Sequence, residues 1–265
     1  FKSSVEQKIM KKAATISALA HRRAMKSCMP GMYEYQLQAE IEYEFTVAGA
    51  SFPAYGSIVG GGDNGCILHY VENSSKLKDG DLVLIDAGCE LQNYAADITR
   101  TFPINGKFTP EQKMIYDIVL EAQIAGIDAC SAGNQWNEPH NATVNIITQG
   151  LLDLGIMKGS FNEMVEKKTY TDFYMHRAGH WLGMDVHDVG DYKLNEQWRT
   201  FQPGMVTTIE PGIYISPDNK NVDECWRGIG IRIEDDVLVT EGVPNTLSSD
   251  APKTISEIEA IMASS

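Results

Sequence analysis

Residues 83–88 read Val-Leu-Ile-Asp-Ala-Gly, and residues 207–212 read Thr-Thr-Ile-Glu-Pro-Gly. In both stretches an apolar run typical of a buried strand ends in a carboxylate, Asp86 or Glu210, and glycine follows two positions later. An ionised carboxylate in such a place is costly unless it is paired or bound to a metal ion. For either acid alone, a strand-end side chain that accepts hydrogen bonds from the next turn is the simpler explanation.

A second carboxylate follows each stretch on a later predicted strand. Asp97 lies in residues 96–99, Ala-Asp-Ile-Thr, and Glu234 lies in residues 231–234, Ile-Arg-Ile-Glu. Two similar half-domains that offer their carboxylate pairs to one shared centre would explain this match, although the matched segments are short. Four carboxylates on one side of a sheet would repel one another strongly without cations between them.

Hydrophobic periodicity arranges the chain in two rounds of helix, helix and strand pair. The expected helices cover residues 4–27, 34–49, 110–130 and 138–154, and the expected strand segments cover residues 82–86, 94–102, 173–176, 205–209, 212–215 and 229–240. The glycine-rich residues 60–65 lack the Gly-Lys-Ser/Thr ending of a phosphate-binding loop, so we expect a flexible loop over a cleft there.

Histidines gather in residues 176–190, His-Arg-Ala-Gly-His-Trp-Leu-Gly-Met-Asp-Val-His-Asp-Val-Gly. A solitary histidine is more often a core or surface residue than a ligand, and we assign that structural role to His21 and His140. The density of histidines in residues 176–190 favours a functional role, and the glycines argue against a helical His-Glu-x-x-His motif. Oxygen-rich ligation with one imidazole suits Mn²⁺, Co²⁺ or Zn²⁺, and two such ions could share four carboxylates.

Composition narrows the classes of protein. The 265 residues fit one large domain or two small ones, and the formal net charge of −14 argues against a nucleic-acid binder. No apolar run approaches the roughly 18 residues of a membrane span. The five cysteines form no Cys-x-x-Cys pair, which favours isolated thiols in a reducing compartment. The first residue is Phe1, which suggests a fragment boundary, and we expect a cytoplasmic location, with a mitochondrial one as the alternative.

Several of these stretches together resemble one family. Their sequences are Leu-Ile-Asp-Ala-Gly-Cys-Glu at 84–90, Asp-Ile-Thr-Arg-Thr-Phe at 97–102, the histidine stretch, Thr-Ile-Glu-Pro-Gly-Ile-Tyr at 208–214 and Arg-Gly-Ile-Gly-Ile-Arg-Ile-Glu-Asp-Asp at 227–236. They resemble the catalytic domain of Xaa-Pro aminopeptidases (aminopeptidase P), in family M24 with the prolidases and methionine aminopeptidases. The resemblance implies an α/β (α+β) pita-bread fold, in which two similar halves form a curved, mainly antiparallel sheet with helices outside. It also implies that residues 1–265 form a single catalytic domain, without the N-terminal domain of full-length members.

The resemblance further assigns the metal ligands. It implies that Asp86 and Asp97 bind one ion, that His180 and Glu210 bind the other, and that Asp97 and Glu234 bridge the two. The usual ions of this family are Mn²⁺, and a hydroxide held between them would attack the scissile carbonyl. Glu210 is then the expected acceptor of the proton from water.

Other residues receive supporting roles. By resemblance, His69 and His187 would contact the peptide and stabilise the developing oxyanion, and His176 would line the substrate pocket. Strand alternation places Arg232 on the same face as Glu234, where it can hydrogen-bond a ligating carboxylate. The candidates for hydrophobic walls, which could equally be core residues, are Trp181, Tyr94 and Tyr214.

The expected reaction is removal of the N-terminal residue from peptides whose second residue is proline. The close alternative is a prolidase, which cleaves only X-Pro dipeptides and needs a cation for the free carboxylate. Arg177 could supply that cation, at a position where close relatives often have glycine. A non-catalytic pita-bread binding module is the remote alternative, and assembly into a homo-oligomer stays open.

Overall fold

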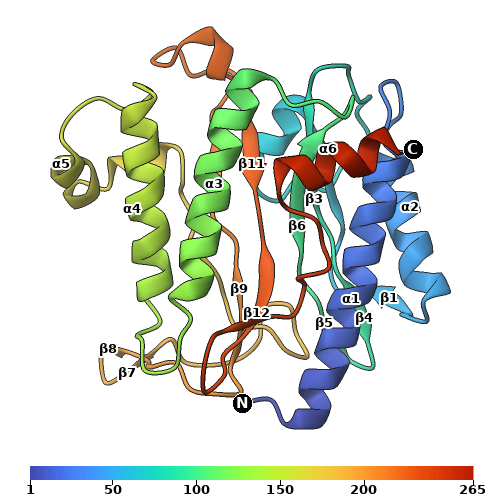
Figure 1. The fold of residues 1–265 in the computed structure, drawn as a ribbon, viewed down its shortest axis with the longest axis vertical. Helices are drawn as coiled ribbons and strands as arrows, with labels where there is room; N and C mark the ends of the chain where they lie inside the picture. Colours follow the sequence, from blue (N-terminus) through green and yellow to red (C-terminus); the bar gives the residue numbers. More distant parts are fainter. Residues whose placement is uncertain (265) are drawn as a thin grey trace.

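The computed structural model describes residues 1–264, and the helices lie on either side of the strands (Figure 1). Helix α1 (Ser4–Ser27) begins at a capping box in which Ser3 and Glu6 each accept a backbone hydrogen bond from the other. It packs against α2 (Glu34–Val47), and Gly49 follows α2 with a φ of +90°. Both helices lie close to the predicted boundaries.

The first round continues into antiparallel strands. β2 (Ile58–Gly61), β3 (Leu82–Asp86) and β6 (Thr99–Pro103) form one sheet in the order β2-β3-β6, with Asp86 opposite Thr99. β1 (Phe52–Pro53), β4 (Cys89–Leu91) and β5 (Tyr94–Ala95) form a second sheet in the order β1-β4-β5. The strand expected over residues 94–102 is therefore interrupted at residues 96–98, immediately around Asp97.

The second round repeats this plan. Helices α3 (Pro110–Asp128) and α4 (Glu138–Asp153) precede β9 (Val206–Ile209), which pairs with β12 (Asp235–Leu238) so that Ile209 faces Asp235. β13 (Asn245–Thr246) completes that sheet, and β10 (Gly212–Tyr214) pairs with β11 (Gly230–Arg232). All these pairings are antiparallel, so the expectation of two similar antiparallel halves is confirmed.

The two halves meet where the segment after β11 runs beside β6. Glu234 N donates to Thr99 O at 3.1 Å, and Thr101 Oγ1 donates to Arg232 O at 3.0 Å. One hydrophobic core takes in apolar side chains of both rounds, including Phe45 of α2 and Val119 of α3. The carboxylate-bearing ends of both strand pairs are thereby brought to one place.

Several segments differ from the sequence expectation. Residues 173–176 form no strand. Tyr214 N donates to Phe173 O at 2.9 Å, but this single bond is not extended into a strand pairing. Residues 60–65 form the end of β2 and the short helix η1 (Gly62–Cys66) instead of a loop over a cleft. A Cβ on Gly230 would lie 2.3 Å from Gly65 O, so glycine here permits close backbone packing.

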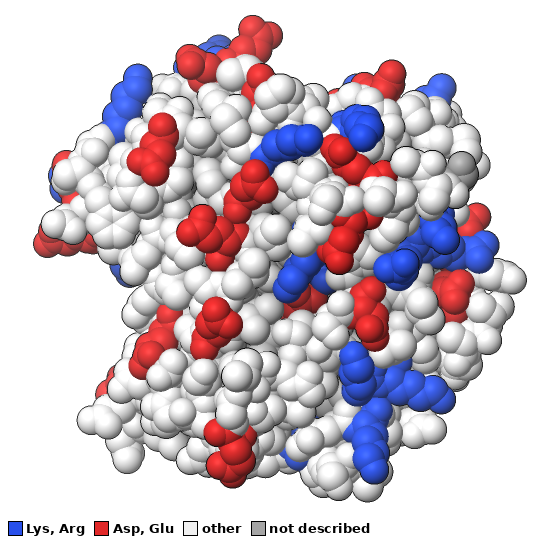
Figure 2. Space-filling model, viewed as in Figure 1, with Lys and Arg blue, Asp and Glu red and all other residues white. Residues whose placement is uncertain are grey.

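The remaining elements are short. They are α5 (Phe161–Glu166), η2 (Thr169–Asp172), the hairpin of β7 (Lys193–Leu194) and β8 (Gln197–Trp198), η3 (Glu224–Trp226) and the C-terminal α6 (Ile255–Ala263). Within residues 1–264, no helix is both long enough and apolar enough to cross a membrane. On the face drawn in Figure 2, acidic and basic side chains are interspersed and no broad basic surface is present.

Candidate metal centre

The four acids singled out in the sequence occupy equivalent positions in the two halves. Asp86 ends β3 and Glu210 directly follows β9, whereas Asp97 and Glu234 stand one or two residues before the antiparallel partner strands β6 and β12. In each half the carboxylates therefore lie at the end of the strand pair, where the hydrogen bonding between the two strands stops. Side chains at these positions can turn toward the centre without disturbing the strand hydrogen bonds.

His180 joins the four acids. Its Nε2 lies 3.3 Å from Asp97 Oδ2 and 3.5 Å from Glu210 Oε1, and ligand atoms of Asp97, His180 and Glu234 lie within 4.8 Å of one another. His180 Nδ1 lies 3.0 Å from Trp181 O, which fixes the ring with Nε2 toward the carboxylates. All five predicted ligands line a single cavity of about 440 Å³.

Tyr55 lies at the centre of this cluster and was missed by sequence reasoning. Its hydroxyl oxygen is 2.6 Å from both Asp86 Oδ1 and Asp97 Oδ1. A phenol carries one proton and can donate to only one of these oxygens, so Tyr55 cannot satisfy both carboxylates at once. Nothing around Tyr55 in the sequence indicates this contact, because it depends on the way β1 and the following turn pack.

Arg232 approaches the cluster from the other side. Its Nη2 donates to Asp86 Oδ2 at 2.7 Å, its Nη1 donates to Tyr214 Oη at 3.0 Å and its Nε donates to Thr99 Oγ1 at 3.1 Å. Thr99 Oγ1 in turn donates to Glu234 Oε2 at 2.6 Å. The guanidinium therefore orients carboxylates of both halves, directly at Asp86 and through Thr99 at Glu234.

Electrostatics show how strongly these acids need a cation. Burial, with the neighbouring carboxylates, raises the pKa of Glu234 well above its ordinary value, and burial above all raises the pKa of Glu210 to about 7. Burial opposes the charge of His180, but the Asp97 and Glu210 carboxylates outweigh it and raise the pKa of His180 to about 9. Burial likewise opposes ionisation of Asp97, whose pKa His180 nevertheless holds below its ordinary value. Bound protons thus reduce the negative charge of this cluster, and divalent cations could reduce it instead.

The remaining predicted histidines also reach the cavity. His69 and His187 are exposed side chains that line it, and the His187 ring meets the His180 ring edge-on with centroids 4.4 Å apart. His176 lines it too, with Nε2 at 2.8 Å from Tyr214 Oη and Nδ1 at 2.9 Å from Arg177 O. The structure therefore brings together all the histidines of residues 176–187 and His69.

The three aromatic residues expected as walls or as core do not line the cavity. Tyr94 lies outside the cavity lining and donates to Glu6 Oε1 at 2.7 Å, because its place in β5 directs it toward the start of α1. Trp181 is buried against Trp136, with ring centroids 4.0 Å apart, and Tyr214 lies behind the lining as a partner of His176 and Arg232. The apolar side chains that do line the cavity are Ile58, Leu68, Val71 and Val186.

The donor set fits divalent metal ions. Four carboxylates and one imidazole nitrogen converge, and hard divalent ions such as Mn²⁺ accept this mixture of oxygen and nitrogen donors. The shared Tyr55 contacts and the raised pKa values of Glu210 and Glu234 are the signs of negative charge in excess.

Comparison with known proteins supports the same reading. The sequence matches the model of metallopeptidase family M24 over residues 8–241. The chain belongs to this family. It is 51% identical to the Xaa-Pro aminopeptidase of Escherichia coli (strain K12) over 262 residues, covering 99% of this chain and 59% of that protein. It is also 51% identical to the Xaa-Pro aminopeptidase of Haemophilus influenzae, covering 98% of this chain and 60% of that protein.

Solved structures agree with the fold of this M24 chain. It superimposes on the structure of Pseudomonas aeruginosa aminopeptidase PepP with a TM-score of 0.99 and 59% identity, over 100% of this chain and 60% of that one. The pita-bread fold expected from the sequence is therefore confirmed. The M24 chain spans about three fifths of the length of these relatives.

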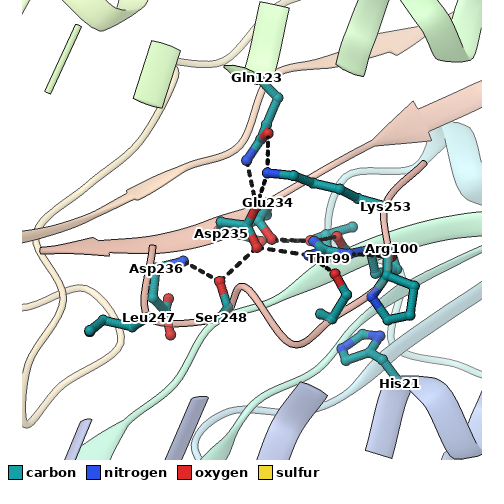
Figure 3. A network of polar contacts seen from close by, with 12 residues as sticks. His21, Thr99, Arg100, Gln123, Glu234, Asp235, Asp236, Leu247, Ser248 and Lys253 are labelled. Carbon is teal, nitrogen blue, oxygen red and sulfur yellow. Dashed lines mark hydrogen bonds and ion pairs between the residues drawn. The ribbon is translucent and has the colours of Figure 1, made fainter. Parts of the chain in front are cut away.

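A buried polar network of this M24 chain lies next to Glu234 and Thr99 (Figure 3). Asp235 accepts hydrogen bonds from Arg100, Gln123, Ser248 and Lys253, at 2.6 to 2.8 Å. Arg100 Nη1 also donates to Glu234 O at 2.6 Å and to Thr99 O at 2.9 Å. The network therefore holds the backbone at Glu234, a predicted metal ligand, and at Thr99, which hydrogen-bonds the Glu234 side chain.

His21 is close to this region, and the structure gives it the structural role expected from the sequence. It is fully buried, and its Nε2 lies 3.0 Å from Ala87 O, next to Asp86. Burial lowers the pKa of His21 to about 4, so the ring is neutral at pH 7. His140 is likewise a packing residue, at a centroid distance of 5.8 Å from the Tyr174 ring.

Proposed function

We propose that this chain is the catalytic part of a manganese-dependent aminopeptidase that removes the first residue from peptides with proline in second position. The observation that carries the proposal is the convergence of four carboxylates and His180 in one cavity of about 440 Å³. That size suits a small peptide. The names of the Escherichia coli and Haemophilus influenzae relatives support the choice of Xaa-Pro peptides.

The proposed metal ligands are those expected from the sequence, namely Asp86, Asp97, His180, Glu210 and Glu234. When bound, two divalent ions supply Lewis acidity that polarises a carbonyl and lowers the pKa of water. Manganese is our choice among the divalent ions because the donor set is rich in oxygen.

The chain's own residues then handle the proton and the substrate. Glu210 would accept the proton of the attacking water, because its carboxylate faces the cavity and Thr208 Oγ1 donates to its Oε1 at 3.3 Å, leaving Oε2 available. His69 and His187, exposed at the cavity lining, would donate hydrogen bonds to peptide oxygens. His176 is held by Tyr214 and would fix the shape of the pocket.

The cavity also suits proline. An X-Pro bond has no N–H to donate, so its recognition depends on shape and apolar contact. Apolar side chains that could contact the pyrrolidine ring line the cavity, namely Ile58, Leu68, Val71 and Val186.

Hydrolysis of three peptides tests the substrate assignment. The manganese-loaded protein should cleave Ala-Pro-Ala between the first two residues and should cleave Ala-Ala-Ala poorly. Activity confined to the dipeptide Ala-Pro would identify a prolidase instead. Failure of the folded protein to bind divalent metal would leave only the binding-module alternative.

The variant Asp97→Ala tests the metal ligands. Removing one carboxylate should abolish metal binding and hydrolysis together, whereas Glu90→Ala, which alters an acid outside the cavity, should retain both. Metal content by elemental analysis and activity are measured on the same samples, with circular dichroism to establish folding. Full activity in Asp97→Ala would refute the assignment.

A further inference from the structure

Two cationic side chains contact the same indole ring beside the candidate metal centre. Arg177 lines the cavity, and its guanidinium carbon lies 4.9 Å from the centroid of the Trp198 ring. Lys193 Nζ lies 4.4 Å from the same ring. Lys193 and Trp198 face each other across the β7–β8 hairpin, which sets their spacing. We call Arg177, Lys193 and Trp198 the cationic rim.

The cationic rim is not neutralised by this chain. Over the described residues 1–264, no carboxylate forms an ion pair with Arg177 or Lys193, and Arg177 Nη2 donates instead to the neutral Asn137 Oδ1 at 2.5 Å. The other cavity arginine, Arg232, is by contrast fully engaged by Asp86, Thr99 and Tyr214. Two unpaired cations that contact one indole ring, in a chain of net charge −14, are therefore available to an anion from outside.

The position of Arg177 within its segment links the rim to the metal centre. Its neighbour Ala178 accepts a backbone hydrogen bond from Glu210 N at 2.8 Å, and His180 follows three positions after Arg177. Arg177 and Glu210 line the same cavity. A small peptide bound at the carboxylate cluster would thus have Arg177 within the same enclosure.

Charge fixes which end of a peptide meets the rim. A cationic free amine is repelled by Arg177, so the rim must face the part of the peptide that follows the scissile bond. In a tripeptide the terminal carboxylate lies on that side, roughly 7 Å beyond the scissile bond for two extended residues. Arginine binds carboxylates with two parallel hydrogen bonds, whereas lysine adds a point charge.

We propose that the cationic rim is a carboxylate-binding subsite for the leaving group of the substrate, with Arg177 as its main ligand. The proposal rests on the proposed aminopeptidase function and adds a substrate class to it, namely short peptides with a carboxylate close behind the proline. The carboxylate could be the peptide's C-terminus or an acidic side chain in third position, and the test separates these sources.

Three substrates carry the test on the manganese-loaded protein. They are Ala-Pro-Ala with a free carboxylate, Ala-Pro-Ala amide, and Ala-Pro-Glu amide, whose only carboxylate is a side chain. We expect kcat/KM for the acid to exceed that for the Ala-Pro-Ala amide about tenfold, through KM. A kcat/KM for Ala-Pro-Glu amide as high as that for the acid identifies a subsite that also binds side-chain carboxylates. A kcat/KM as low as that for Ala-Pro-Ala amide identifies a subsite that binds only the C-terminal carboxylate.

Variants assign the effect to the rim. Arg177→Ala should abolish the acid-over-amide preference by raising KM for the acid, with little change in kcat, and Arg177→Lys should restore part of it. Lys193→Ala should give a smaller loss, and Lys12→Ala, which removes an exposed cation outside the cavity, should give none. Equal kcat/KM for acid and amide in the unaltered protein, or a preference that survives Arg177→Ala, overturns the proposal.

A binding measurement separates this proposal from the proposed function. Calorimetry with Pro-Ala and Pro-Ala amide, which correspond to the leaving group, should show tighter binding of the acid, and Arg177→Ala should remove the difference. Retention of this difference without turnover of any X-Pro peptide would refute the proposed aminopeptidase alone. Equal binding of the two ligands would refute the subsite alone.

Discussion

Arg232 Nη2 donates a hydrogen bond to Asp86 Oδ2 over 2.7 Å, and the two residues belong to opposite halves of the chain. Asp86 ends β3 in the first half, and Arg232 ends β11 in the second. Both side chains are largely buried, so the bond is strong and poorly screened by salt. One contact thus joins the halves and orients a proposed metal ligand.

Replacing Arg232 should weaken metal binding. Partners of ligating groups commonly change metal affinity by about 10–100-fold when removed, and we expect a loss in this range for Arg232→Leu. Calorimetric titration with Mn²⁺ measures the affinity, and Arg22→Leu on α1, outside the cavity, serves as the matched control. Unchanged affinity in Arg232→Leu would show that Asp86 is oriented without it.

Metal binding should release protons. In the metal-free protein the pKa of His180 is raised to about 9 and that of Glu210 to about 7, and both must be deprotonated to bind an ion. Apparent affinity for Mn²⁺ should therefore fall as the pH decreases, and Glu234, whose pKa is also raised, adds to the number of protons released. Calorimetry in buffers of different ionisation enthalpy counts these protons, and a pH-independent affinity would contradict the ligand set.

The same groups set the stability of the metal-free protein. Burial raises the pKa of Glu210 from its ordinary value of 4.5, which holds in the unfolded chain, to about 7 in the folded protein. Its contribution to stability is present below about pH 4.5 and is lost as the pH rises through about 7. In chelated protein this contribution is measured as the difference in free energy of unfolding between the unaltered protein and Glu210→Gln, which should diminish as the pH rises over this window.

Whether a residue of this site could be predicted from the sequence depends on how far apart in the chain the residues that position it lie. Asp86 and Glu210 end apolar strands, and strand alternation put Arg232 on the face of Glu234, so local pattern sufficed for them. Tyr55 touches acids 31 and 42 positions away through a turn of no regular pattern, and no local signal reports such packing. The direction of Tyr94 depends on the pairing of two-residue strand β5, which alternation over residues 94–102 obscured.

Stability should depend on His21 between pH 4 and 6.5. Burial lowers the pKa of His21 from 6.5 to about 4, so in this window the unfolded chain binds more protons than the folded one. The contribution of the neutral ring is full above about pH 6.5 and is lost as the pH falls toward about 4. Between pH 7 and pH 5 the loss amounts to about 2 kcal/mol.

Urea unfolding at pH 7 and pH 5 tests this. His21→Gln retains a hydrogen-bond donor for Ala87 O but cannot titrate, so its stability should fall less between the two pH values than that of the unaltered protein. The matched control is His69→Gln, which replaces an exposed histidine. An equal fall in His21→Gln and in the unaltered protein would assign the dependence to other groups.

The buried pair of Arg100 and Asp235 should be the most sensitive point of the network in Figure 3. Both side chains are 0% exposed, and Arg100 Nη2 lies 2.7 Å from Asp235 Oδ1. Burial opposes ionisation of Asp235, yet Arg100 and Lys253 outweigh it and lower its pKa to about 2. Removing one partner of such a pair leaves an uncompensated buried charge, which costs about 3–5 kcal/mol.

Arg100→Met should therefore lower the free energy of unfolding by an amount in that range at pH 7, measured with urea. Lys107→Met removes a largely exposed partner of Glu259, with Lys107 71% exposed, and should cost less than about 1 kcal/mol. The double variant Arg100→Met/Asp235→Asn should recover part of the loss, because the unpaired carboxylate is then gone. A double variant less stable than Arg100→Met would mean that Asp235 is held mainly by Gln123, Ser248 and Lys253, and that Arg100 acts chiefly through its bonds to the Thr99 and Glu234 carbonyls.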